Sequence, residues 1–261
     1  MTSSPAIIDV SPLKERSGPF WDDLRLFWAD RHTFRYEPAP MEGDPDLEWI
    51  TSESGVPWLE LDIDIPGHEE MVEEALACRD LFVGHRGGDS WGWQGSTLHG
   101  IDPKSTRSPG NYGYASDAEA PYVWTELADR CPVTTAFLKE FLTFRKLHRV
   151  RFMLLEPMGC ILPHIDTWNR SLTSMNISLS NPDGAHFKLL DRGEIPFKPG
   201  KAFMVDVSST HSCVNLSDTP RLHIIAQGEE PLPEFDSLVR RSFMKTWGRE
   251  AALQSTDGRT A

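Results

Sequence analysis

The pattern of apolar and polar positions differs between the two halves of the chain. Residues 18–31 predict a short amphipathic helix, because apolar residues recur there at helical spacing. Residues 66–80 predict another, since Pro66 suits a first helical turn that two glutamates make acidic. Residues 121–147 are typical of helix, with a break near Pro132. The N-terminal half is therefore expected to contribute mainly helices.

From residue 149 onward, short strand-like stretches follow one another at regular spacing. Turn-forming residues such as Pro199 and Gly200 separate them, as expected for consecutive strands of a β-rich domain. The predicted strands are 149–155, 160–166, 172–180, 185–190, 193–198, 202–207, 211–216 and 221–227.

This succession of strands predicts a mainly β fold with flanking α, namely a double-stranded β-helix (jelly roll) with N-terminal helices. We expect one domain over residues 1–250. Within it, residues 1–148 form a helical and β flank with substrate loops, 149–228 the jelly-roll core and 229–250 a C-terminal helix. Residues 251–261 are expected to be a disordered tail.

Composition narrows the classes of partner. The formal net charge of −13 disfavours binding to a phosphate backbone, so we expect no nucleic acid as partner. An acidic substrate stays possible, because a buried arginine can dominate its own pocket. The four cysteines form no CxxC pair, and no apolar stretch is long enough for a signal or a membrane span. A cytoplasmic protein without a membrane partner is expected.

The segment LPHIDTW carries the most informative chemistry. On a strand, His164 and Asp166 point to the same side because side chains alternate with a period of two. His211 lies far enough along the chain to return on a distant strand. Two histidines and one carboxylate on one face form a facial triad, which suits iron(II) and leaves coordination positions open. His186 is an alternative second histidine, although it is expected to face solvent beside Lys188.

Arg221 strengthens this interpretation of the triad. It lies ten residues beyond His211, across a turn, so its strand is expected to run back beside the strand of His211. A guanidinium there can form a bidentate pair with the distal carboxylate of a dicarboxylate that chelates the metal. A surface arginine after a turn is the alternative. His223 shares the face of Arg221 and lies either near the co-substrate or in the packed core.

Three stretches of residues 149–228, LEPMGCILPHID, MNISL and KAFMVDVSSTHSCVNLSDTPRLHII, resemble the aspartyl/asparaginyl β-hydroxylase-like group. This group belongs to the 2-oxoglutarate/iron(II) oxygenase superfamily and includes hydroxylases of free amino acids. The N-terminal half resembles it only weakly. Asn176 corresponds to a residue that helps hold the co-substrate and is a histidine in the peptidyl hydroxylases of the group. Those enzymes also lack the carboxylate ligand, so Asp166 indicates the ordinary three-ligand form, and it disfavours a halogenase.

The resemblance implies an enzyme with Fe(II) and 2-oxoglutarate as cofactors and dioxygen as co-substrate. It would hydroxylate an unactivated C–H bond of an amino acid, or of an amino-acid-derived or peptidyl substrate, and release succinate and CO2. Two other classes remain open. A cupin-like metal-binding or sensing jelly roll would need no dicarboxylate anchor at Arg221, and a zinc-dependent isomerase or hydrolase would give no iron(II)–2-oxoglutarate colour.

Candidate substrate residues lie mainly in residues 84–117, a segment rich in Gly, Ser, Pro and aromatics. The segment is expected to form strand and loop, and a loop this long in a compact domain is typical of function. Within it, His85 and Arg86 with Trp91 and Trp93 could recognise a substrate carboxylate and its aliphatic body. The alternative is a loop cation beside core tryptophans. Arg151 is a second candidate anchor if its strand face points into the barrel, and otherwise a surface residue.

Overall fold

The computed structural model describes residues 8–30, 44–168, 172 and 174–248. The predicted tail 251–261 lies outside these residues. The helices before the first long strand are α1 (Lys14–Ser17), α2 (Trp21–Ala29), α3 (Leu47–Ser52) and α4 (His68–Ala77). The later helices are α5 (Glu126–Arg130), α6 (Pro132–Phe141) and α7 (Pro233–Thr246). Short 3-10 turns cover Ser11–Leu13, Gly18–Phe20, Arg79–Leu81 and Pro109–Tyr112.

The first strands are β1 (Trp58–Glu60), β2 (Val83–Gly84), β3 (Ser90–Gly100) and β4 (Val123–Trp124). The core strands are β5 (Phe144–His164), β6 (Ser174–Ser180), β7 (Ala185–Leu189), β8 (Gly193–Glu194), β9 (Lys201–Val205), β10 (His211–Asn215) and β11 (Arg221–Pro231). The main path of the sheet is β1-β9-β6-β11-β5-β10-β7-β8, and β3 pairs with β5. All the pairings are antiparallel, and the jelly-roll architecture with flanking helices confirms the predicted fold class.

Strand β5 joins the two halves of the jelly roll. Its first half pairs with β11, from Phe144 to Leu155, and its end pairs with β10, from Gly159 to His164. Where it passes from one partner to the other, Met158 has a positive φ of 57°. The sequence predicted two strands here, 149–155 and 160–166, because Pro157 and Gly159 resemble a turn. The structure keeps them as one bent strand, since β3 pairs alongside both parts.

Several other boundaries also moved. The predicted helical segment 121–147 ends earlier, because α6 stops at Phe141 and β5 begins at Phe144. The predicted strand 193–198 is reduced to the two residues of β8, and the N-terminal helix begins as a 3-10 turn before α2. The segment 84–117, which was expected to form strand and loop, contains the long strand β3 and the loop that follows it.

The two faces of β5 have different surroundings, and this difference creates the cavity. Val150, Phe152 and Leu154 are fully buried on one face, where they join a core shared with α3 to α7. The alternate residues Arg151 and Met153 point to the opposite face and line a cavity inside the barrel. The helix layer therefore supplies the hydrophobic support, and the polar strand positions are directed inward.

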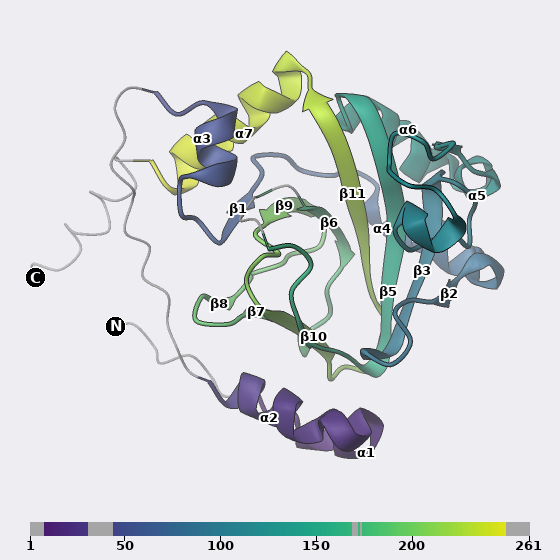
Figure 1. Ribbon diagram of the computed structural model, residues 1–261, viewed down its shortest axis with the longest axis vertical. Coiled ribbons are helices and arrows are strands. Elements are labelled where there is room, and N and C mark those ends of the chain that lie inside the picture. The colour runs from purple at the N-terminus through teal and green to yellow at the C-terminus, as the bar shows by residue number, and fades with distance from the viewer. Residues whose placement is uncertain (1–7, 31–43, 169–171, 173, 249–261) are drawn as a thin grey trace, which may run out of the picture.

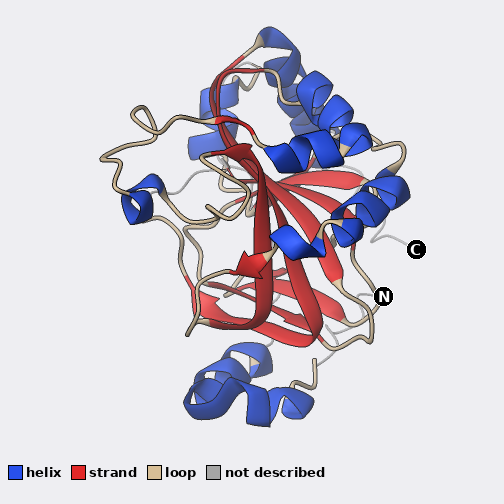
Figure 2. Ribbon diagram, turned by 90° about the vertical axis from the view of Figure 1, so that its right-hand side faces the viewer, coloured by secondary structure: helices blue, strands red, loops and turns tan. Residues whose placement is uncertain are grey.

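A separate helical layer, α1 and α2, covers the strands of the other half. Figures 1 and 2 show these helices below the sheet, apart from the other helices. Trp28 donates a hydrogen bond from Nε1 to Ser212 on β10 at 3.1 Å, and the Lys188 ammonium donates to the Phe27 carbonyl at 2.9 Å. The face of β7 that was expected to meet solvent is therefore covered, and Lys188 is buried. Every helix within the described residues is too short or too polar to cross a bilayer.

An irregularity in the pairing of β3 with β5 decides which tryptophan enters the cavity. Trp91 pairs with Cys160 but Trp93 with Leu155, so the register shifts at Gly92, which has a φ of 69°. Trp93 consequently lines the cavity, whereas Trp91 lies outside, 48% exposed, with the Arg16 guanidinium over its ring. The expectation that Trp91 belongs to the pocket is wrong, because the irregular pairing and the positive φ of Gly92 cancel the shared face that alternation implies.

We predict that Gly92→Ala lowers the free energy of unfolding by about 1–3 kcal/mol. The new Cβ would lie 3.0 Å from Glu156 Cβ in a backbone region that L-residues rarely adopt. Urea denaturation measures the change. Gly87→Ala is the matched control, since a Cβ added there would meet nothing within 4 Å and its φ is not positive. Equal stability of the two variants would contradict the role of Gly92.

Candidate active site

Three side chains meet where β5 ends and β10 begins. His164 is the last residue of β5, His211 is the first of β10, and the two are paired directly across the sheet. Asp166 lies in the turn after β5, where its N–H donates to the Val207 carbonyl at 3.0 Å. The potential ligand atoms of His164, Asp166 and His211 all lie within 4.8 Å of one another. The predicted strand 160–166 is thus too long, but the tethered turn still directs the carboxylate toward both imidazoles.

Backbone carbonyls orient both rings. Nδ1 of His164 lies 2.7 Å from the Leu162 carbonyl, and Nδ1 of His211 lies 2.9 Å from the Ser209 carbonyl. A carbonyl only accepts, so each Nδ1 must donate, which leaves each Nε2 as the nitrogen turned toward the carboxylate. The two Nε2 atoms lie 3.6 and 3.8 Å from the Asp166 carboxylate oxygens. Hydrogen bonds from Nδ1 to a backbone carbonyl, as in both residues here, commonly fix the orientation of metal-binding histidines.

The protonation states also fit a cation. Burial, followed by the charge of His164, lowers the pKa of His211 to about 4, so its ring is neutral near pH 7. Burial alone would raise the pKa of Asp166, but the charges of Arg86, His211 and His164 outweigh it and hold the pKa below its usual value. Two imidazoles and one carboxylate, without a thiolate, are the ligand set that suits non-haem iron(II). The residues present therefore fit this metal.

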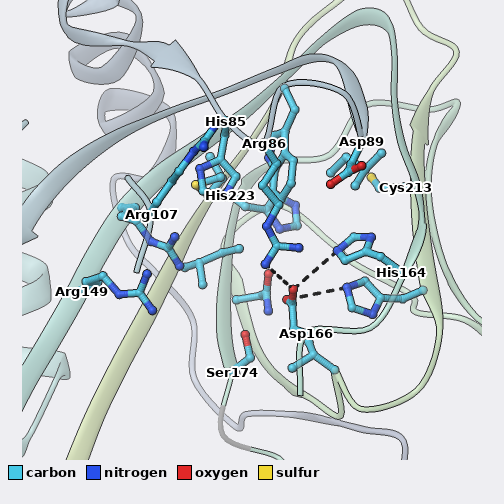
Figure 3. Close-up of a pocket in the computed structure, with 18 of the residues that line it drawn as sticks. His85, Arg86, Asp89, Arg107, Arg149, His164, Asp166, Ser174, Cys213 and His223 are labelled. Atoms are coloured by element: carbon cyan, nitrogen blue, oxygen red, sulfur yellow. Dashed lines mark hydrogen bonds and ion pairs between the residues drawn. The ribbon is translucent and has the colours of Figure 1, made fainter. Parts of the chain in front are cut away.

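The triad borders a cavity of about 770 Å³ inside the barrel. Figure 3 shows the Arg86 guanidinium pointing at Asp166, with His164 beside that carboxylate. Phe187 stacks on the ring of His211, with centroids 5.4 Å apart and planes at 13°. Asn176 of β6 is buried and lines the same cavity.

Arg221 and His223 form a second polar group in this cavity, on β11. The Arg221 side chain is buried, its Nε donates to Asn181 Oδ1 at 3.0 Å, and its guanidinium packs over Phe197. Arg221 Nη2 donates to His223 Nδ1 at 3.0 Å, because a guanidinium cannot accept. Burial and the charge of Arg221 hold the pKa of His223 well below its usual value. The neutral ring must then carry its proton on Nε2, which is buried without a partner among the described residues.

The candidate substrate residues in segment 84–99 differ in their surroundings and contacts. The Arg86 guanidinium donates to Asp166 Oδ1 at 2.6 Å, and Arg86 adopts a positive φ of 49°. His85 is buried, its Nδ1 lies 3.0 Å from Thr106 Oγ1, and its ring meets the Trp93 ring edge-on with centroids 4.4 Å apart. Burial, followed by the charges of Arg151 and Arg86, lowers the pKa of His85 to about 3. His85 is therefore a neutral residue near pH 7 and not a cation.

The structure also places residues that the sequence left undecided or missed. Arg151 is buried and lines the cavity. Arg149, two positions earlier on the same strand face, is half-buried and also lines it. Alternation from Arg151 could have identified Arg149. Arg107 and Asp89 complete the polar lining from loops, which carry no sequence periodicity. His186 faces away from the cavity, between Glu194 and the ring of Trp28, so it is held by neighbours and not simply exposed to solvent.

Comparison with known proteins gives one family match. The model of the family described as aspartyl/asparaginyl beta-hydroxylase matches residues 83–231. No curated protein matches the sequence.

Similar solved structures include a Pseudomonas putida prolyl-4-hydroxylase, at 15% identity over 67% of this chain and 94% of that one, with a TM-score of 0.39. An oxidoreductase of the 2OG-Fe(II) oxygenase family from Burkholderia pseudomallei is 14% identical over 66% of this chain and 84% of that one, with a TM-score of 0.41. The epimerase SnoN from nogalamycin biosynthesis is 13% identical over 65% and 76% of the two chains, with a TM-score of 0.37. Likenesses this distant carry no weight for the activity of this chain.

We predict that His85 stays neutral throughout pH 5–8, as an NMR titration of the metal-free protein would show. Its unfolded pKa of 6.5 exceeds the folded value of about 3, so the unfolded chain binds more protons on this residue between these values. Stability must then fall as the pH decreases below 6.5, by on the order of 2 kcal/mol down to pH 5 from this residue. His85→Gln should show a shallower decrease in Tm with acidity. A His85 resonance that titrates near pH 6.5 would contradict the assignment.

Proposed function

The chain belongs to the aspartyl/asparaginyl β-hydroxylase family, and from this membership we propose that it hydroxylates an unactivated C–H bond of an amino acid, or of an amino-acid-derived or peptidyl substrate. It is a 2-oxoglutarate-dependent non-haem iron dioxygenase. The observation that carries the proposal is one cavity lined both by a two-histidine, one-carboxylate cluster and by a buried arginine without a carboxylate partner among the described residues.

We assign the iron to His164, Asp166 and His211. Their Nε2 and carboxylate atoms converge from one side, so they would occupy one face of the metal. Iron(II) with 2-oxoglutarate and dioxygen supplies the oxidising power, one oxygen atom going to the substrate and the other to succinate as CO2 is released. The Arg86 guanidinium, at 2.6 Å from Asp166, keeps that carboxylate ionised and oriented. This contact favours Arg86 as a positioning residue over the substrate anchor that the sequence indicated.

Arg221 and His223 are assigned to the distal carboxylate of 2-oxoglutarate. Burial lowers the pKa of Arg221, a cost that a bound carboxylate would offset. His223 uses Nδ1 to accept from Arg221 and can offer its otherwise unpaired Nε2–H to the same anion. Asn176 lines the cavity from the neighbouring strand and is assigned a supporting contact to the co-substrate. A cupin-like sensor would have no use for this pair of donors.

The substrate space is assigned to the cavity wall formed by Trp93, Met153 and Arg151. Trp93 and Met153 can pack on an aliphatic body, and Arg151, which is buried with its Nε unpaired, can anchor a carboxylate. Because Arg86 already pairs with Asp166, Arg151 is the better candidate of the two. A screen of amino acids and short peptides that follows succinate release tests the proposed activity, and the visible band of anaerobic iron(II) with 2-oxoglutarate distinguishes it from a zinc enzyme.

We expect alanine at His164, Asp166 or His211 to abolish iron retention and substrate-coupled succinate formation, since each removes one ligand. The fold should persist, because the three side chains line the cavity and lie outside the hydrophobic core under the helix layer. Iron content after anaerobic dialysis and circular dichroism measure the two effects. His186→Ala is the matched control, a histidine outside the cavity. Full coupled activity of His211→Ala, with His186 essential instead, would refute the assignment.

We expect Arg221→Ala to raise the Kd for 2-oxoglutarate about 10- to 100-fold, because a charge-assisted bidentate pair is lost. Arg221→Lys should recover only part of the affinity, since an ammonium lacks the guanidinium fork. Titration of the anaerobic iron(II) protein, followed by its visible band, gives the Kd. Arg145→Ala, an exposed arginine on β5, should bind as the wild type does. An unchanged Kd in Arg221→Ala would remove the arginine from the co-substrate site.

A further inference from the structure

The cavity has an excess of positive charge that the metal and co-substrate do not remove. Its lining holds five arginines, at positions 86, 107, 149, 151 and 221, against two aspartates, at positions 89 and 166. Iron(II) carries two positive charges and 2-oxoglutarate two negative ones, so together they leave this excess of three unchanged. The protein as a whole has a formal net charge of −13, so the cavity reverses the sign of its surroundings.

Two of the five arginines have partners other than the substrate in the proposed function. Arg86 pairs with Asp166, and Arg221 is assigned to the distal carboxylate of 2-oxoglutarate. The other three, Arg107, Arg149 and Arg151, form no ion pair with a carboxylate of the described residues. We call these three side chains the arginine wall. Figure 3 shows Arg107 and Arg149 together, on the side of the pocket away from His164.

The wall is built from two elements that are fastened to each other. Arg149 and Arg151 project from β5, and each has a buried Nε without a hydrogen-bond partner among the described residues. Arg107 follows Thr106, whose carbonyl accepts from Arg151 Nη1 at 2.7 Å and whose Oγ1 lies 3.0 Å from His85 Nδ1. The neighbouring Ser105 carbonyl accepts from Thr97 Oγ1 at 2.9 Å. The loop that carries Arg107 is therefore held against the strands.

Gathering three guanidiniums without an anion is unfavourable. Burial, and after it the charge of Arg149, lower the pKa of Arg151 to about 9, which still leaves it protonated at pH 7. Like charges repel, most strongly where they are shielded from water, as the buried Nε atoms of Arg149 and Arg151 are. Buried charges are normally paired. A zwitterionic amino acid has no net charge and cannot offset the excess. The anion that does so must come with the substrate.

On the basis of the proposed function, we propose that the substrate is net anionic and carries an extra oxyanion, a second carboxylate or a phosphate ester, bound by the arginine wall. Guanidiniums bind both groups through paired N–H donors, so the two sources share one recognition chemistry. The apolar residues Trp93 and Met153, which line the same cavity, are left to pack against the carbon chain of the substrate.

The test is calorimetric titration of the anaerobic iron(II)–2-oxoglutarate protein with two pairs of ligands. One pair is L-glutamate and L-glutamine, and the other is O-phospho-L-serine and L-serine. We expect the acidic member of at least one pair to bind about 10-fold more tightly or better, as the loss of a charge-assisted hydrogen bond implies. Preference in the glutamate pair identifies a carboxylate, and preference in the serine pair identifies a phosphate.

Arg149→Gln and Arg107→Gln should each remove most of this preference. Arg107 is exposed at the cavity rim, so its variant is expected to fold even if the half-buried Arg149 variant does not. Arg145→Gln is the matched control, because it removes the same charge from an exposed position of the same strand and should retain the preference.

Three outcomes would overturn the arginine wall as an anion site. They are equal binding within both pairs of ligands, no binding of either acidic ligand, and a preference that survives both Arg149→Gln and Arg107→Gln. The visible iron(II)–2-oxoglutarate band, recorded on the same samples, reports on the proposed function separately. A band without any charge preference rejects only the anionic substrate, whereas the absence of the band rejects the proposed function itself.

Discussion

The antiparallel pairing of β10 with the end of β5 is the contact on which the candidate site depends. It sets His211 directly opposite His164, with ring centroids 4.3 Å apart, and the following turn brings Asp166 to both. A slip of one residue would turn His211 to the other face of the sheet. That face is packed against α2 through Ser212 and Trp28, so the hydrophobic layer beneath the sheet specifies the register of the histidines.

Strand β5 extends this constraint to the rest of the cavity. It is 21 residues long, so one continuous backbone carries Arg149 and Arg151 at one end of the cavity and His164 at the other. Its opposite face is anchored by Val150, Phe152 and Leu154 under the helix layer. The polar residues of β5 therefore keep fixed positions relative to the metal ligands without forming a core of their own. This is the rigid support that an active site requires.

Electrostatics inside the barrel follows local geometry and not the overall composition. The chain is acidic, yet its cavity is lined by five arginines, of which Arg151 and Arg221 are buried. Histidines in the same cavity respond in the opposite way, because burial and neighbouring guanidiniums keep His85 and His223 neutral. The same low-dielectric interior thus provides both guanidinium cations and neutral imidazole rings. The cations can form ion pairs with an anion, and the neutral rings can donate hydrogen bonds to it.

The sequence by itself determined the mainly β jelly roll with its helices, through turn residues and strand periodicity, and it identified the family through the motifs around His164 and Arg221. It also predicted that His164, Asp166 and His211 converge; the structure brings their donor atoms within 4.8 Å, and their role as ligands stays a prediction. Only the tertiary structure decided that Arg151 points inward, that Trp91 points outward and that Arg86 pairs with Asp166. Alternation divides a strand into two faces but does not say which face a helix layer will cover. The positive φ of one glycine, Gly92, interrupts the alternation of side chains along β3. Partners that meet only through space, such as Arg86 and Asp166, have no counterpart in local sequence.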